Sequence, residues 1–249
     1  MRVVLVMSQV NYVPKNYLPF LQTLLLESKQ HVAGIIFLQN REFDLIKSIA
    51  ALCFVGARKL SAQLLRNASE SFIDPRMKLC IENRIPTLIA QNLNAPDVLS
   101  WLAEKNPDLV VNARTRCIYK RELLQLPRLG CINIHHGILP QYRGTMCDLY
   151  ALSEGRDAGF SIHKMSEKLD DGNIIVAQIT SHAGESDYLK HLERSATLEA
   201  KALSKILEEC SHTDNLPLGT DNNCANIIYT KTPQSRNAMR AILRTGVKA

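Results

Sequence analysis

The chain has 249 residues, of which 46% are hydrophobic and 22% are charged, as in ordinary globular proteins of one large domain. Its seven cysteines form no CxxC pair, so neither a disulfide framework nor a zinc site is expected. No apolar run approaches the ~20 residues of a membrane helix, and the amino terminus lacks a signal-peptide cleavage site. We therefore expect a cytoplasmic protein that binds neither a membrane nor a metal ion.

The net charge of +6 is concentrated at the carboxyl end of the chain. Residues 222–249 contain five basic residues and no acidic residue, which leaves about +1 for the rest. A nearly neutral body gives no support to a broad nucleic-acid-binding surface. Nucleic acid stays open as a partner only through the basic tail, and a homodimer is left open as well.

Strand and helix patterns alternate along the chain. Residues 2–7 and 32–38 are apolar and β-branched, as in buried strands, and leucines at helical spacing lie between them. Further helices are expected at 42–47, 49–55, 59–68, 74–83, 94–103, 119–124 and 187–210, and further strands at 86–89, 108–111, 129–134 and 160–165. This alternation predicts an α/β fold with a mainly parallel central sheet and helices on both faces.

The loop after the first strand contains no glycine between Ser8 and Tyr12. A Rossmann dinucleotide site, which needs a glycine-rich turn at this position, is therefore not expected. Tyr12 is a candidate substrate contact, and an ordinary loop residue is the alternative interpretation.

A dense polar cluster follows two of the predicted strands. Asn133 and His135 are two residues apart on one strand, so their side chains point to the same face. Asp170 follows the strand at 160–165, in a Leu-Asp-Asp-Gly turn. Polar residues at strand ends beside glycine turns are typical of a site in an open α/β sheet.

These three residue types suit acyl transfer to an amine. An imidazole titrates near neutrality, and a nearby carboxylate raises its pKa and holds its orientation. An amide can donate a hydrogen bond to an oxygen that becomes negative during the reaction. Asn133, His135 and Asp170 would supply these parts, and no Ser or Cys nucleophile is required.

The motifs Asn133-x-His135, Leu139-Pro-x-Tyr-Arg-Gly144 and Leu169–Gly172 resemble the formyltransferase family that uses 10-formyl-tetrahydrofolate. The similarity runs from residue 107 to about residue 179. It implies a Rossmann-like formyltransferase fold and a catalytic role for Asn133, His135 and Asp170. The chain departs from the pattern at Gly137, where many members have Ser, and at His136, where many have Pro or Gly.

The resemblance also implies roles for the residues around this cluster, with 10-formyl-tetrahydrofolate as co-substrate and no metal. The expected folate contacts are Val111, Asn112, Ala113, Arg114, Leu169 and Asp171, the loop after residue 111 acting mainly through its backbone. Arg114 would pair with the folate glutamate tail or a substrate anion, or else be solvated. The expected substrate contacts are Tyr12, Arg143, Gly144 and Asp148, although Arg143 could instead brace its loop by bonding backbone carbonyls.

The carboxyl-terminal part is expected to lie outside the catalytic unit. We predict a formyltransferase catalytic domain at 1–210 and a linker with a basic helical tail at 211–249. Arg236, Arg240 and Arg244 recur every four residues and fall near one helix face. That face could contact phosphates, and an ordinary solvated face is the alternative.

The substrate that accepts the formyl group can be inferred from the sequence only by elimination. Ribonucleotide formyltransferases carry a glycine-bearing phosphate loop that is missing here, and the 38 residues after Ser211 are too few for the RNA-guiding domain of methionyl-tRNA formyltransferases. We therefore expect a small primary amine, first of all an amino sugar carried on a nucleotide. The methionyl-tRNA and ribonucleotide activities stay as alternatives. So do hydrolysis of 10-formyl-tetrahydrofolate, because the deformylases often carry a pair like His135-His136, and folate binding without catalysis.

Overall fold

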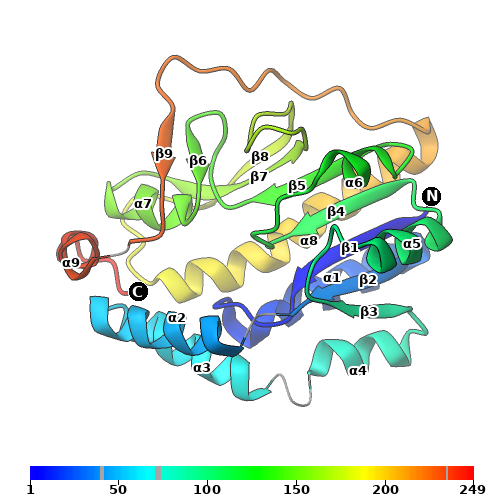
Figure 1. Ribbon diagram of the computed structural model, residues 1–249. Helices are drawn as coiled ribbons and strands as arrows, with labels where there is room; N and C mark the ends of the chain where they lie inside the picture. The colour runs from blue at the N-terminus through cyan, green and yellow to red at the C-terminus, as the bar shows by residue number, and fades with distance from the viewer. Residues whose placement is uncertain (40–41, 71–73, 234) are drawn as a thin grey trace.

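A computed structural model describes residues 1–39, 42–70, 74–233 and 235–249, and its centre is a seven-stranded sheet (Figure 1). The strand order is β3-β2-β1-β4-β5-β7-β8. The strands are β1 (Val3–Ser8), β2 (Val32–Leu38), β3 (Thr87–Ala90), β4 (Leu109–Ala113), β5 (Cys131–His135), β7 (Ala158–Lys164) and β8 (Ile174–Ser181). Strands β1 to β5 pair in parallel, and β7 and β8 are antiparallel. The predicted mainly parallel sheet is confirmed.

Helices cover both faces of this sheet (Figure 1). They are α1 (Leu18–Ser28), α2 (Glu42–Val55), α3 (Arg58–Glu70), α4 (Pro75–Glu82), α5 (Pro96–Lys105), α6 (Arg121–Gln125), α7 (Cys147–Ser153), α8 (Tyr188–Thr213) and α9 (Arg236–Arg244), with 3-10 turns η1 (Pro14–Tyr17) and η2 (Lys29–His31). Asp187 caps α8 by accepting from the Lys190 N–H. Among the described residues, no helix is both long and apolar enough to span a membrane.

The alternation of side chains in β1 explains the two layers of helices. Val3, Leu5 and Met7 point into one core, which also contains buried residues of α1 and α8. Val4 and Val6 point into a second core with residues of α5 and α6. A strand buried on both faces must be apolar throughout, and the sequence of β1 meets that demand.

The strand register brings the polar cluster to one edge of the sheet. Asn112 of β4 lies beside Asn133 of β5 in the parallel register, and His163 of the antiparallel β7 lies beside Asn133 on the other side. The loop from β7 to β8 then carries Asp170 back over this edge. The site therefore forms where carboxyl ends of parallel strands meet an antiparallel neighbour, as expected for an open α/β sheet.

The segment after α8 returns to the same edge. Strand β9 (Ile228–Thr230) pairs in parallel with β6 (Tyr142–Gly144), and both stand side by side in Figure 1. Gly144 has a φ of +106°, and a Cβ there would lie 2.2 Å from the Thr230 carbonyl oxygen, so the pairing needs glycine. Helix α9 forms as expected, with Met239 and Ile242 buried. The division between 1–210 and 211–249 stays a prediction, and α8 runs across it.

Candidate active site

A cleft of about 1170 Å³ opens at the carboxyl ends of β1, β4 and β5. Asn133, His135 and Asp170 all line this cleft, so the three residues expected to be catalytic come together. Gly144 and Tyr12, two of the expected substrate contacts, line it as well.

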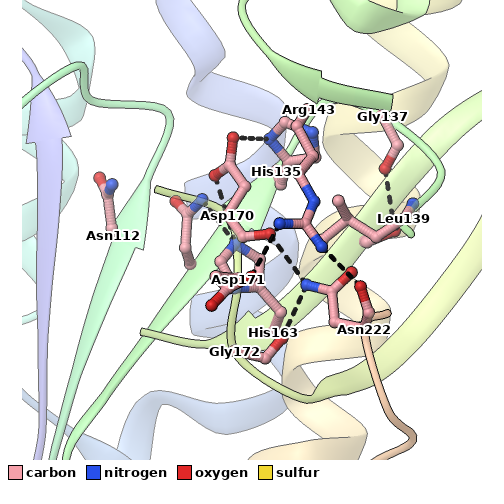
Figure 2. A network of polar contacts seen from close by, with 12 residues as sticks. Asn112, His135, Gly137, Leu139, Arg143, His163, Asp170, Asp171, Gly172 and Asn222 are labelled. Carbon is pink, nitrogen blue, oxygen red and sulfur yellow. Dashed lines mark hydrogen bonds and ion pairs between the residues drawn. The ribbon is translucent and has the colours of Figure 1, made fainter. Parts of the chain in front are cut away.

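Both nitrogens of the His135 ring have a neighbouring oxygen, and Figure 2 shows the one from Asp170. Its Nε2 lies 2.9 Å from the backbone carbonyl oxygen of Tyr142. A carbonyl can only accept, so Nε2 carries the proton in this contact. The other nitrogen, Nδ1, lies 3.5 Å from Asp170 Oδ2. The neutral ring therefore presents a lone pair at Nδ1, and a proton placed there would meet the carboxylate.

Asp170 is held in place by its own backbone and by two neighbours. Its φ of +49° is left-handed, which is uncommon outside glycine. The N–H of Gly144 donates to its Oδ2 at 3.0 Å, and Asn222 Nδ2 donates to its carbonyl oxygen at 2.9 Å. Such strain at a buried carboxylate is typical of functional sites.

His163 orients the amide of Asn133. His163 Nδ1 lies 2.8 Å from the Lys164 carbonyl oxygen and must donate to it, so in the neutral ring His163 Nε2 accepts from Asn133 Nδ2 at 3.1 Å. The Asn133 amide keeps a second N–H for another acceptor. His163 also lines the cleft, and its Nε2 is 3.6 Å from Asp170 Oδ1.

Burial and charge act in opposite directions on the two residues of the pair. Burial lowers the pKa of His135, and the nearby Asp170 carboxylate opposes this without reversing it. The carboxylate thus acts in the expected direction, but burial outweighs it, because the ring is only 5% exposed. Burial raises the pKa of Asp170, but the contact with His163, the charge of His135 and the Gly144 N–H together bring that pKa below its ordinary value.

The residues expected to contact folate are placed in different ways. Asn112 lines the cleft, and its Oδ1 accepts from the backbone N–H and the hydroxyl of Thr115 at 3.1 and 2.6 Å, which closes the loop after β4. Leu169 also lines the cleft and is 67% exposed. Val111 and Ala113 are buried within β4, so only their backbone could take part.

The side chain of Arg114 does not point where we expected. Its Nε and Nη2 donate to Glu199 of α8 at 3.2 and 2.6 Å, and its Nη1 contacts His136 Nδ1 at 2.8 Å. Tyr17 and Ser195 also donate to Glu199. The guanidinium is 2% exposed, so the expected pairing with a folate tail or a substrate anion is wrong for this side chain. Only its backbone remains a candidate.

Three further expected contacts belong to the frame of the site. Arg143 is buried, and its guanidinium donates to Asp171 Oδ1 at 2.8 Å and to the Asn222 carbonyl oxygen at 2.5 Å (Figure 2). This is the bracing alternative for Arg143, and it also occupies Asp171. Asp148 is 1% exposed and accepts from the Tyr188 hydroxyl at 2.7 Å. None of these three residues lines the cleft.

Asn222 and Glu199 are site-forming residues that the sequence did not reveal. Asn222 lies in a polar loop and joins Asp170 to Gly172 through its amide, and nothing in the surrounding sequence marks it. Glu199 gave a weak signal, because an acidic residue sits within the apolar stripe of α8 and must find a buried partner. Among the described residues, no group of three or more His, Cys, Asp or Glu side chains is arranged to hold a metal ion.

Comparison with known proteins agrees with this geometry. The formyl transferase family model matches residues 53–207, more than half of the chain. A methionyl-tRNA formyltransferase of Geobacter metallireducens is 32% identical over 157 residues, which are 62% of this chain and 49% of that protein. The chain spans about half the length of the curated relatives that it matches first.

Solved structures share the fold. A sugar N-formyltransferase from a Shewanella species has a TM-score of 0.59 at 18% identity and covers 98% of this chain and 88% of its own. A phosphoribosylglycinamide formyltransferase from Anaplasma phagocytophilum has a TM-score of 0.60 at 18% identity, with 93% and 99% covered.

The fold and the site together define an α/β protein with an Asn–His–Asp cluster in a cleft at the carboxyl ends of its strands. The chain belongs to the formyl transferase family.

Proposed function

We propose that the protein transfers a formyl group from 10-formyl-tetrahydrofolate to a primary amine. The observation that carries this proposal is the placement of Asn133, His135 and Asp170 on one cleft, inside the segment that matches the family. A hydrogen-bonding amide, an imidazole with an open lone pair and a fixed carboxylate are what direct acyl transfer to an amine requires.

In the proposed reaction, the amine nitrogen forms a bond to the formyl carbon while the bond from that carbon to N10 of the folate breaks. The free N–H of Asn133 donates to the formyl oxygen as it becomes negative. Nδ1 of His135 accepts the proton that the amine loses, and Asp170 at 3.5 Å stabilises the resulting imidazolium. His135 then returns that proton to N10. Positioning of the two substrates supplies much of the remaining rate.

The donor is proposed to lie between the loop after β4 and the loop that carries Asp170. Asn112 and Leu169 line this part of the cleft, which supports the folate contacts inferred from the family motifs. The backbone from Val111 to Arg114 and the Asp171 loop would complete it. We also propose a cytoplasmic location, which is supported by seven cysteines that are all free.

The acceptor is proposed here only as a small primary amine. An amino sugar on a nucleotide, expected by elimination, is supported only by a likeness of fold to sugar N-formyltransferases. Hydrolysis of 10-formyl-tetrahydrofolate is the second candidate, because both members of the pair His135-His136 line the cleft.

The test follows tetrahydrofolate released from 10-formyl-tetrahydrofolate, with and without a panel of amines that includes nucleotide-linked amino sugars. We expect release to require an amine and to fall at least about a hundredfold in His135→Ala. His182→Ala is the matched control, because the His182 side chain is 84% exposed and should leave release unchanged.

Each other outcome has a defined meaning. Release that needs no amine but still needs His135 would support the hydrolase. Binding of the folate without release, under every condition tried, would contradict the enzyme and favour a folate-binding protein.

A further inference from the structure

Several backbone N–H groups of the loop after β1 are paired within the chain. The N–H groups of Asn11 and Val13 donate to the side-chain oxygens of Asn16 and Asn11, each at 2.9 Å. The N–H of Gln9 donates to the Leu38 carbonyl oxygen at 2.8 Å. Asn16 is 2% exposed, and its amide closes the loop by donating to the Gln9 carbonyl at 2.6 Å.

Two buried side chains hold the same loop from beneath. Asn67 Nδ2 donates to the carbonyl oxygens of Asn11 and Val13 at 2.6 and 2.7 Å. Arg76 is fully buried, pairs with Asp74 at 2.7 Å and donates to the Ser8 carbonyl at 3.0 Å.

A backbone anion site works because several N–H groups point outward without a partner. Here the N–H groups of Gln9, Asn11 and Val13 are already donated within the chain. The buried contacts that hold the loop also oppose its rearrangement, because every broken contact would leave a buried polar group unpaired. The loop is therefore not built to hold a phosphate.

We name two ends of the cleft. The donor end lies between the loops 112–119 and 165–170, where the proposed function places the folate. The acceptor end is bounded by the loop 8–13 and by α2 and α3. Most of the side chains that line it are apolar, and the polar ones include Asn11, Tyr12, Asp44 and Ser48. The apolar ones are Val10, Val13, Leu45, Ala51, Leu52, Val55, Leu60 and Leu64.

The charges along the cleft agree with this division. Among the described residues that line it, the arginines and lysine are Arg114, Arg116 and Lys168, all on the donor end. Arg114 is already paired with Glu199. The described charged residue at the acceptor end is Asp44, whose carboxylate would repel an anion.

We infer that the acceptor is a primary amine carried on an apolar aliphatic or aromatic body, with no phosphate bound in the acceptor end. The inference rests on the proposed function, since it assumes that the amine meets the formyl group at His135. Burying an apolar body against apolar side chains is favourable, whereas a phosphate would lose its hydration without gaining a cation from the described residues of this end. A nucleotide-linked amino sugar, the expectation from the sequence, does not fit these walls.

The test compares amines that differ in one feature. Propylamine, butylamine, pentylamine and hexylamine form one series, and 6-aminohexyl phosphate matches hexylamine with a phosphate added. We expect kcat/KM to rise about fourfold for each methylene. We expect 6-aminohexyl phosphate and a nucleotide-linked amino sugar to be at least about tenfold poorer than hexylamine.

A variant pair then locates the effect. Leu52→Lys places a cation on the cleft wall, and Ile46→Lys makes the same change on the same helix at a side chain that is 64% exposed and outside the lining. Leu52→Lys should raise KM for hexylamine at least about tenfold and flatten the chain-length series. Ile46→Lys should match the wild type. Calorimetric binding of hexylamine to each protein gives the same comparison without turnover.

The outcomes separate the two proposals. Preference for a phosphate-bearing amine, or equal behaviour of the two variants, would overturn the inference while formyl transfer stands. Hexylamine binding that depends on Leu52, without formylation of any amine, would support the ligand class and overturn the proposed reaction. Absence of both binding and formylation would overturn both.

Discussion

Gly137 shows how closely the chain packs around the ring of His135. A Cβ at this position would lie 2.8 Å from His135 Nε2 and 2.6 Å from the Cβ of Cys147. Both distances are shorter than real Cβ contacts allow, so an added methyl group must displace the ring or α7. Glycine at this position, where many family members have Ser, therefore leaves the room that the His135 ring occupies in this chain.

We predict that Gly137→Ala lowers the rate of formyl transfer more than it lowers stability. A displaced ring loses its contact with Tyr142, and a misplacement of about 1 Å can cost about a hundredfold in rate. The measurements are kcat and the thermal midpoint. Gly155→Ala is the control, since it strains a left-handed backbone where no atom lies within 4 Å. An unchanged kcat in Gly137→Ala would show that the packing does not set the ring position.

His136 should make stability depend on pH. Burial, and then the charge of Arg114, place its pKa well below the ordinary value of about 6.5. As the pH falls below about 6.5, the unfolded chain binds a proton at this residue and the folded chain does not. The free energy of unfolding must therefore fall with decreasing pH in that window.

We predict that His136→Gln flattens this dependence between pH 7 and pH 5. The slope lost is at most about 1.4 kcal/mol per pH unit, which is the effect of one proton. Denaturant unfolding at each pH measures it. His182→Gln serves as control, because that ring is exposed. Parallel curves for wild type and His136→Gln would mean that His136 titrates alike in both states.

For single residues, the direction of some side chains can be predicted from the sequence and that of others cannot. Asn133 and His135 could be assigned to one face from their spacing alone, because a strand has a period of two. The direction of Arg114 could not be predicted. It depends on a left-handed backbone at 114 and on Glu199, 85 residues away, and neither leaves a local signal.

Among the elements, the loop after α8 helps to hold the site, although its polar sequence gives no sign of this role. Asn222 is 2% exposed, and its amide donates to the carbonyl oxygens of Asp170 and Gly172, both at 2.9 Å. Its own carbonyl accepts from Arg143. One residue thus joins the carboxyl-terminal segment to the turn that carries Asp170.

We predict that Asn222→Ala costs about 1 to 3 kcal/mol of stability, because two carbonyls lose their donor. It should also lower kcat, since the turn that holds Asp170 is released. Asn223→Ala is the matched control, as Asn223 is exposed and its side chain donates to its near neighbour Asp221. Chemical unfolding and turnover measure the two effects. Equal behaviour of the neighbours would remove Asn222 from the frame of the site.

Several helices were predictable, whereas the shortest strands were not. Helices α3, α4 and α8 have capping residues or apolar stripes that define them, and the expected ranges fall close to the observed ones. Strands β6 and β9 have three residues each, too few to show a period. Their pairing joins segments about 85 residues apart, so only the tertiary structure reveals it.

For the whole molecule, the order of strands and helices was enough to predict the class of fold. Alternating buried strands and helices leave few arrangements other than a parallel sheet covered on both faces. The chemistry of the cleft needed the structure. The missing glycines after β1 exclude one kind of phosphate loop, but only the contacts of Asn16, Asn67 and Arg76 show what the loop does instead.

Much of the net positive charge of the chain lies near its carboxyl end, on and around α9. Arg240 and Arg244 are exposed on α9, and none of the described residues that line the cleft lies on this helix. At physiological salt, charges farther apart than about 8 Å are largely screened. We predict that the double variant Arg240→Glu and Arg244→Glu changes kcat/KM for a small amine by less than about twofold at physiological salt. A large fall in kcat/KM of the variant, together with a wild-type kcat/KM that depends on salt, would mean that the basic face of α9 contacts the substrate. A polyanionic acceptor would then become a candidate again.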